Sequence, residues 1–226
     1  AIFDEGHNQY YRFSSEYMQG VISTISEYAP VIISSGTFQL DLLDPSITSL
    51  VIIPNPEPVN SVVFTDEEMQ KLQEYIESGG NVMLMGNWYM YFWPDSPGGY
   101  NDLTAKYGIY WIDGDVYDQT NNFGSSWDVK IMAFADNDVA KVMLSGVEYV
   151  RYSGTALNIT DPEEGINVII YPILFGNNES FLTLGAETEP PVAKGRNITL
   201  AVAAVVNNMG KIFAIGSVYA FSDYYY

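Results

Sequence analysis

Residues 64–93 carry a pattern of apolar and polar positions that predicts a helix, a buried strand and then an aromatic loop. Thr65, followed three residues later by Glu68, predicts a capping box at the start of the helix. The Gly79-Gly80 pair predicts the end of the helix, because glycine adopts positive φ without a steric penalty. The apolar face of this helix is expected to consist of Met69, Leu72, Tyr75 and Ile76.

The residues after this helix predict a strand and, directly behind it, a candidate binding site. Residues 82–85 are apolar at every position, which is typical of a strand covered on both faces. Gly86 ends the strand, and Asn87, Trp88 and Tyr89 follow it. Ligands of open α/β sheets bind beyond the carboxyl ends of the strands, so this loop is the first candidate site. The alternative is that its aromatic residues are buried and pack over the hydrophobic core.

Residues 1–90 alternate short apolar runs with helical patterns. Met18, Val21 and Ile22 lie on one face of a helix predicted over residues 15–28. Strands that alternate with helices predict βαβ units, hence a mainly parallel sheet with right-handed crossovers. We expect residues 51–53 and 82–85 at the centre of this sheet. The other elements predicted here are strands over residues 1–3, 31–33 and 50–53 and a helical turn near residues 40–43.

The second half of the chain is richer in β patterns. Asn207 and Gly210 supply the positive φ that a turn requires, so residues 198–206 and 211–215 are predicted to form a hairpin. A short helix is expected over residues 101–107, and further strands are expected over residues 109–112, 129–134, 147–152 and 168–173. No repeat or linker divides the sequence, so we interpret residues 1–226 as one domain with a parallel half and a β-rich half.

Composition narrows the classes of partner. The 226 residues include 28 Asp and Glu but only 9 Lys and Arg, for a formal net charge of −19. The negative electrostatic field of such a chain repels nucleic acid and anionic membranes, and it favours the binding of cations or of neutral, hydroxyl-rich partners. No apolar run approaches the ~20 residues that span a bilayer, so no direct membrane insertion is expected. Cysteine is absent, which excludes thiol catalysis, cysteine zinc sites and disulfides.

Several short segments, taken in order, resemble a class I glutamine-amidotransferase-like fold. They are Phe3-Asp-Glu-Gly-His7 with Tyr10-Tyr11, Val51-Ile-Ile-Pro-Asn-Pro56, Phe64-Thr-Asp-Glu-Glu68, Gly79-Gly80 through Gly86-Asn-Trp-Tyr89, Tyr152-Ser-Gly154 and Gly210-Lys-Ile-Phe-Ala-Ile-Gly-Ser217. The most similar branch is the domain shared by gliding-motility ABC-transporter auxiliary proteins, intraflagellar transport proteins and archaeal envelope proteins. The resemblance spans nearly the whole chain.

This resemblance implies a flavodoxin-like three-layer sandwich with a mainly parallel central sheet and a β-rich C-terminal half ending in a hairpin. Catalytic members carry a Cys on a strand-to-helix turn, with His and Glu late in the chain. Here there is no Cys, and the single histidine, His7, stands near the start. Asn87 stands where members of the branch often carry Asp. The resemblance therefore implies a non-catalytic binding or assembly module and no cofactor.

The loop after the first strand contains the only histidine together with two acids. Asp4 and His7 are expected to brace this loop by hydrogen bonds, and a ligand contact is the alternative. A zinc site needs more ligands than one His and two acids supply here. Because the carboxyl ends of parallel strands share one edge of a sheet, His7 should come near Trp88. Tyr10 or Tyr11 should pack on the aromatic loop, with Asp118 and Asn121 closing the rim.

Asp113, Asp115 and Asp118 have an i, i+2, i+5 spacing of oxygen ligands that suits a hard cation. The fourth acid and the glycine of a standard calcium loop are missing, which favours a solvated acidic turn. Asp161, Glu163 and Glu164 beside Pro162 are interpreted as a surface turn in the same way.

Three N-x-Ser/Thr sequons point to an exported chain. They begin at Asn158, Asn178 and Asn197, and chance occurrence is the alternative for each one. We expect all three on exposed loops or strand ends, with at least one of them glycosylated. The chain is rich in Tyr, Asn, Ser and Thr and poor in Lys, which supports an extracellular or cell-envelope location. We expect a prokaryotic source, and we favour an archaeal one.

The leading hypothesis is a non-catalytic, extracytoplasmic module that contacts a protein or a glycan and is capable of homo-assembly. Flat aromatic rings beside amide and carboxylate groups suit neutral sugars or peptides. Serine hydrolysis is disfavoured because Ser153, Ser217 and Ser125-Ser126 have no nucleophile elbow and no base except His7. The alternative is a carboxylate-dependent hydrolase that acts on a glycan, which would require two carboxyl groups ~5–9 Å apart in one open cleft.

Overall fold

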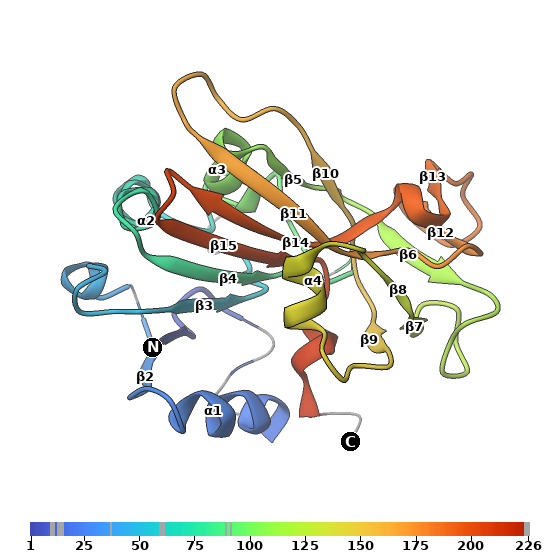
Figure 1. Cartoon of the computed structure of the whole chain (residues 1–226), viewed down its shortest axis with the longest axis horizontal. Coiled ribbons are helices and arrows are strands. Elements are labelled where there is room, and N and C mark those ends of the chain that lie inside the picture. The colour runs from blue at the N-terminus through green and yellow to red at the C-terminus, as the bar shows by residue number, and fades with distance from the viewer. Residues whose placement is uncertain are drawn as a thin grey trace.

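The computed structural model describes residues 1–226 except 10–11, 13–15, 37, 59–61, 89, 91 and 224–226. The described residues form a mixed α/β fold that is rich in strands (Figure 1). Its largest sheet has ten strands, with eight in the order β2-β1-β3-β4-β15-β14-β10-β5. The strands of this path are β2 (Ile32–Ser34), β1 (Ile2–Asp4), β3 (Val51–Pro54), β4 (Asn81–Met85), β15 (Gly210–Ile215), β14 (Thr199–Val206), β10 (Leu157–Ile159) and β5 (Ile109–Trp111).

The two halves of the sheet differ in strand direction. From β2 to β15 every neighbouring pair is parallel. Beyond β15 the pairs are antiparallel, and β14 also pairs with β11 (Val168–Phe175), which in turn pairs with β8 (Ala133–Phe134). The expected central position of residues 51–53 and 82–85 is confirmed, and the sheet as a whole is mixed because the second half is antiparallel.

Two smaller antiparallel sheets lie beside the large one. One has the order β13-β12-β6, and the other pairs β7 with β9. Their strands are β6 (Asp115–Asp118), β12 (Ser180–Thr183), β13 (Ala193–Lys194), β7 (Val129–Ile131) and β9 (Val150–Tyr152). The sequence pattern did not predict β6, β10, β12 or β13, because these short strands lack an apolar run.

Helix α2 (Asp66–Glu77) begins as the sequence predicts. The Thr65 hydroxyl accepts a hydrogen bond from the Glu68 amide, and the Glu68 carboxylate accepts one from the Thr65 amide at 2.9 Å. The predicted helix over residues 15–28 is shorter, because α1 covers only Gln19–Ser26 after a 3-10 turn. The other helices are α3 (Tyr100–Thr104) and α4 (Asp138–Met143), and the 3-10 segments are η1 (Glu16–Met18), η2 (Leu40–Leu42), η4 (Ala105–Tyr107), η5 (Gly195–Asn197) and η6 (Val218–Phe221).

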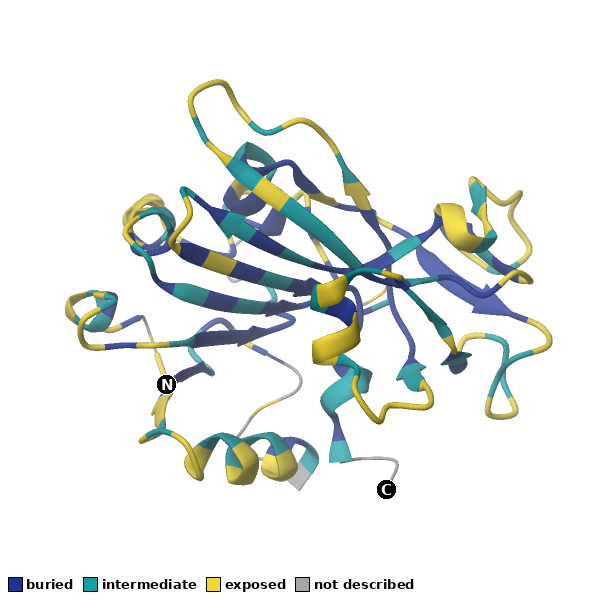
Figure 2. Ribbon diagram, viewed as in Figure 1, coloured by how far each residue is buried: buried dark blue, intermediate teal, exposed yellow. Residues whose placement is uncertain are grey.

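The core forms on both sides of the parallel strands, but the two sides are not equally covered (Figure 2). Val82 and Leu84 of β4 are buried in the cluster that includes Leu72 and Ile76 of α2. Met83, which points to the opposite face, is only half-buried. Full cover on both faces, as the sequence predicts for residues 82–85, is therefore wrong at Met83.

Candidate functional site

The carboxyl ends of β1, β3 and β4 lie at one edge of the sheet, and backbone hydrogen bonds join the loops that leave them. The Asn55 amide donates to the Met85 carbonyl at 2.8 Å, and the Glu57 amide donates to the His7 carbonyl at 2.9 Å. The loops that carry Asp4-His7 and Asn87-Trp88 therefore emerge at the same edge, as parallel pairing requires. Tyr10, Tyr11 and Tyr89 lie outside the described residues.

A buried polar cluster occupies the loop after β1. His7 Nδ1 lies 2.8 Å from Asp4 Oδ2, and His7 Nε2 lies 3.3 Å from Glu68 Oε1. Asp4 also accepts hydrogen bonds from the Gly6 amide at 3.0 Å and from the Gln9 side chain. Asp4, His7 and Glu68 are all buried. The expected hydrogen bond between Asp4 and His7 is confirmed, and Glu68, predicted only as a helix cap, is the further partner.

The two carboxylates favour the charged form of the imidazole. Burial alone would lower the pKa of His7, but the hydrogen bond and charge of Asp4, together with Glu68, raise it above the ordinary 6.5. Burial alone would raise the pKa of Glu68, yet the hydrogen bonds from Thr65 and the nearby His7 lower it. The cluster therefore favours the imidazolium form of His7, and it ties the β1 loop to the start of α2.

The aromatic loop packs on a different part of the chain from His7. The His7 ring lies 5.0 Å from the ring of Phe38 and 4.5 Å from that of Phe64. The Trp88 ring stacks on Trp127, with centroids 6.4 Å apart and an interplanar angle of 19°. The expected closeness of His7 to Trp88 stays a prediction.

Asn87 is buried, so it does not offer its amide to a surface ligand. Its side-chain oxygen accepts a hydrogen bond from the Trp88 amide at 2.9 Å. The amide group therefore shapes the start of the aromatic loop.

Asp118 is a buried brace and not part of an open rim. Its carboxylate accepts hydrogen bonds from the backbone amides of Thr120 at 2.9 Å and Asn121 at 2.7 Å. It also accepts from the Ser180 hydroxyl at 2.9 Å and from the Asn177 amide at 3.2 Å. Burial alone would raise the pKa of Asp118, but these hydrogen bonds lower it. Asn121 lies against Asp118, and this contact closes a turn.

The interpretation of residues 113–118 as a solvated acidic turn is wrong for two of its three aspartates. Strand β6 buries Asp115 and Asp118, whereas Asp113 is exposed. Asp115 and Asp118 are three positions apart on one strand, so their side chains point to opposite faces. Within the described ranges, no group of three His, Cys, Asp or Glu side chains could hold a metal ion.

Near the same sheet edge, the hydroxyl of Ser217 forms hydrogen bonds with backbone groups. The Ser217 hydroxyl donates to the Ser153 carbonyl at 2.8 Å and accepts from the Ser153 amide at 3.0 Å. It also accepts from the Tyr219 amide at 3.2 Å. Both serines are buried, and among the described residues the polar contacts of the His7 ring are with Asp4 and Glu68 and not with either hydroxyl.

All three sequon asparagines are exposed, which confirms the predicted exposure. Asn178 lies in a turn and Asn197 ends η5, whereas Asn158 lies inside strand β10. At Asn158 the threonine of the sequon, Thr160, is exposed too. At Asn178 the corresponding Ser180 is buried against Asp118.

Sequence reasoning found Trp88 but missed the other members of an aromatic surface, which we define as Trp88, Phe123, Trp127 and Tyr149. Phe123, Trp127 and Tyr149 are 39%, 40% and 40% exposed, which is unusual for rings of this size. The Phe123 and Tyr149 rings lie 5.6 Å apart. The guanidinium of Arg151 lies 4.7 Å from the centre of the Phe123 ring, and the ammonium of Lys130 lies 4.5 Å from that of Tyr149. The only signal in the sequence was the aromatic content of these turns.

A polar cavity of about 540 Å³ lies on another part of the surface, beside α3. It is lined by the exposed carboxylates of Asp95, Asp102 and Glu163, with Lys106 and Tyr110. Lys106 is paired with Glu77 at 2.7 Å. Asp102 accepts a hydrogen bond from the Gly98 amide at 2.8 Å.

The fold resembles that of a solved intraflagellar-transport domain. The mmIFT52 N-terminal domain superposes with a TM-score of 0.73 at 16% identity, over 98% of this chain and 87% of that one. An exo-β-1,4-mannosidase, Op5Man5 from Opitutaceae bacterium strain TAV5, gives 0.47 at 8% identity, over 96% of this chain and 30% of that one. The cytoplasmic protein STM1381 from Salmonella typhimurium LT2 gives 0.45 at 8% identity, over 88% and 75%. No protein-family model matches the sequence, and no curated protein matches it significantly.

Proposed function

We propose that this chain is a non-catalytic binding or assembly module of a prokaryotic cell surface, with an archaeal source favoured over a bacterial one. In this proposal it contacts a glycan or a protein through the aromatic surface. The observation that carries the proposal is the engagement of the polar groups at the sheet edge. His7 contacts both Asp4 and Glu68, and the Ser217 hydroxyl donates to the backbone carbonyl of Ser153. Such hydrogen-bonded networks hold a scaffold together, which supports a structural role for these groups at the sheet edge.

The same reasoning supports the finer fold assignment. We propose a class I amidotransferase-like three-layer sandwich whose catalytic machinery is absent, in the branch that includes intraflagellar transport domains. The likeness to the mmIFT52 N-terminal domain supports this relationship at the level of the fold. The exposed sequons and the net charge of −19 support an extracellular location and a glycoprotein. In the described part of the chain, no helix has both the length and the apolar character to cross a bilayer.

The aromatic surface is the part of this proposal that binding experiments address. Trp127 is 40% exposed and stacked on Trp88, so one ring face is supported while part of the ring stays open to a partner. Flat rings bind the apolar faces of sugars and peptide side chains without a large loss of conformational entropy. We expect Trp127→Ala to weaken binding of the ligand at least tenfold, as measured on a glycan array and then by calorimetry with the best glycan.

The matched control is Trp93→Ala, because Trp93 is 38% exposed and belongs to the aromatic loop but not to the aromatic surface. Equal losses in both variants, with the fold intact by circular dichroism, would contradict the assignment. Binding only to proteins in a parallel display would assign the surface to a protein partner.

The second candidate is a carboxylate-dependent glycan hydrolase, and the polar cavity beside α3 is the observation that favours it. Three exposed carboxylates face one cavity there, and two carboxyl groups are the machinery of glycoside hydrolysis. Turnover of a glycan that disappears in Asp102→Asn or Glu163→Gln, with the fold intact, would establish this function in place of the first.

A further inference from the structure

The two faces of the central sheet differ in how well they are covered. On β15, Ile212 and Ala214 are buried beneath α2 and α3, whereas Phe213 between them is half-buried. Ala203 of β14 shares that half-covered face with Met83 of β4. Figure 2 shows the resulting alternation of buried and partly exposed positions along these strands. A sheet of this kind needs cover on both faces, so one face lacks part of its layer.

The half-covered face forms a groove of about 900 Å³. One wall is α4 with the segment behind it, including Met143 and Val147, which are 44% and 37% exposed. The other wall includes Phe221 of η6. In Figure 1, α4 lies in front of one end of the sheet, and no described helix lies in front of β4 and β15 at their other end.

The charges of the groove are opposite to those of the molecule. Its only charged lining residues are Lys211 and Arg151, in a chain with 28 acidic and 9 basic residues. Arg151 is neutralised by Asp128, with Nη2 2.5 Å from Oδ2. Lys211 is exposed and takes part in no ion pair with any described residue. A partner that carries a carboxylate would therefore be attracted to this end of the groove.

We propose that this groove docks one amphipathic helix of a partner protein, with its apolar face on Met83, Ala203 and Phe213 and an Asp or Glu opposite Lys211. A five-residue strand such as β4 is about 16 Å long. That length matches about three helical turns, with apolar anchors at i, i+3 or i+4, and i+7. The small Ala203 side chain at the floor allows the helix to approach closely. A second copy of the chain is a poor occupant, because two molecules of charge −19 repel each other.

The groove meets the aromatic surface at Tyr149, but Trp127 does not line the groove, so Trp127→Ala distinguishes the two proposals. The experiment is a display selection of helical peptides against the full chain, followed by affinity measurement of the selected peptides. We expect the selected peptides to share apolar residues at i, i+3 or i+4, and i+7, together with at least one Asp or Glu. Lys211→Glu should weaken them at least tenfold, and so should Met143→Glu. Both residues are exposed, so neither change threatens the fold.

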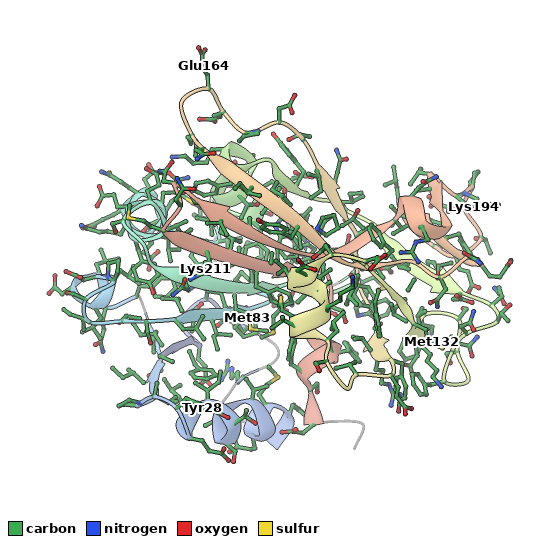
Figure 3. The ribbon with its side chains drawn as sticks, viewed as in Figure 1. Tyr28, Met83, Met132, Glu164, Lys194 and Lys211 are labelled. Carbon is green, nitrogen blue, oxygen red and sulfur yellow. The ribbon has the colours of Figure 1, made fainter. Side chains whose placement is uncertain are left out.

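Lys194→Glu is the matched control, because Lys194 is an exposed cation on β13 at the far end of the molecule, whereas Lys211 and Met83 mark the groove face (Figure 3). Binding should be unchanged in this variant and in Trp127→Ala. The proposal would be overturned if the selection yielded no binding peptide. It would also be overturned if the selected peptides bound the Lys211→Glu and Met143→Glu variants as tightly as the parent. A dimer in sedimentation that Met143→Glu dissociates would assign the groove to a second copy and overturn it too.

Discussion

His7 is the single residue on which the sheet edge depends most, because its charge satisfies two buried carboxylates. Its pKa lies above the unfolded value of 6.5, so its contribution to stability is fully present below that pH. As the pH rises through the folded pKa, the contribution is lost. We therefore expect the free energy of unfolding to fall as the pH is raised from 6 to beyond the folded pKa, as measured by urea denaturation.

His7→Gln is the control for this titration, because the chain has no other histidine. The variant should lose the pH-dependent part of the stability and be less stable than the parent at pH 6. Removal of the imidazolium by His7→Ala should cost about 3 kcal/mol, the usual effect of leaving a buried charge without its partner. A parent whose stability is flat between pH 6 and 8 would contradict the imidazolium assignment.

Helix α2 shows how one side chain joins two elements. Thr65→Ala removes a capping hydroxyl and should lower the free energy of unfolding by about 1 kcal/mol. Glu68→Ala should cost more, because the carboxylate also accepts a hydrogen bond from the Phe38 amide at 3.2 Å and pairs with His7. Urea denaturation measures both losses. Glu67→Ala, at an exposed position of the same turn, should change stability by less than about 0.5 kcal/mol.

If Glu68→Ala were no more harmful than Thr65→Ala, the carboxylate would serve the helix alone. The β1 loop would then be held by Asp4 and not by α2.

The elements that the sequence predicts best are those whose burial depends on apolar side chains. Strands β3 and β4 and helix α2 have such patterns, and their order and central place follow from them. Strand β6 could not be predicted in this way, because hydrogen bonds from Asn177 and Ser180, remote in sequence, satisfy its buried Asp118. Burial of a charge depends on partners that only the folded chain brings together.

The candidate site was predictable only in part for a similar reason. The position of Asp4 and His7 after a strand, and their hydrogen bond, follow from local sequence. The stacking of Trp88 on Trp127 does not, because the two residues come from segments without any shared pattern. The segments around Ser153 and Ser217 both entered the family resemblance, and the structure places them in direct contact.

The whole molecule carries far more negative than positive charge, with a formal net charge of −19. Repulsion between surface carboxylates destabilises the compact state, and dissolved salt screens it over a Debye length of ~8 Å at physiological ionic strength. We expect the melting temperature to rise as sodium chloride is increased from 10 to 200 mM, as measured by calorimetry. A melting temperature that falls over this range would mean that favourable ion pairs outweigh the net repulsion.

Strand β15, close to the end of the chain, is placed between β4 and β14 in the middle of the sheet. Lys211 of β15 pairs with Asn81 of β4. Strand β4 is synthesised long before β15. During translation the hydrogen-bonding edge of β4 that pairs with β15 therefore stays unpaired until β15 has left the ribosome. We therefore expect the central sheet to be completed late in synthesis, and a chaperone that shields this edge to raise the yield of folded protein.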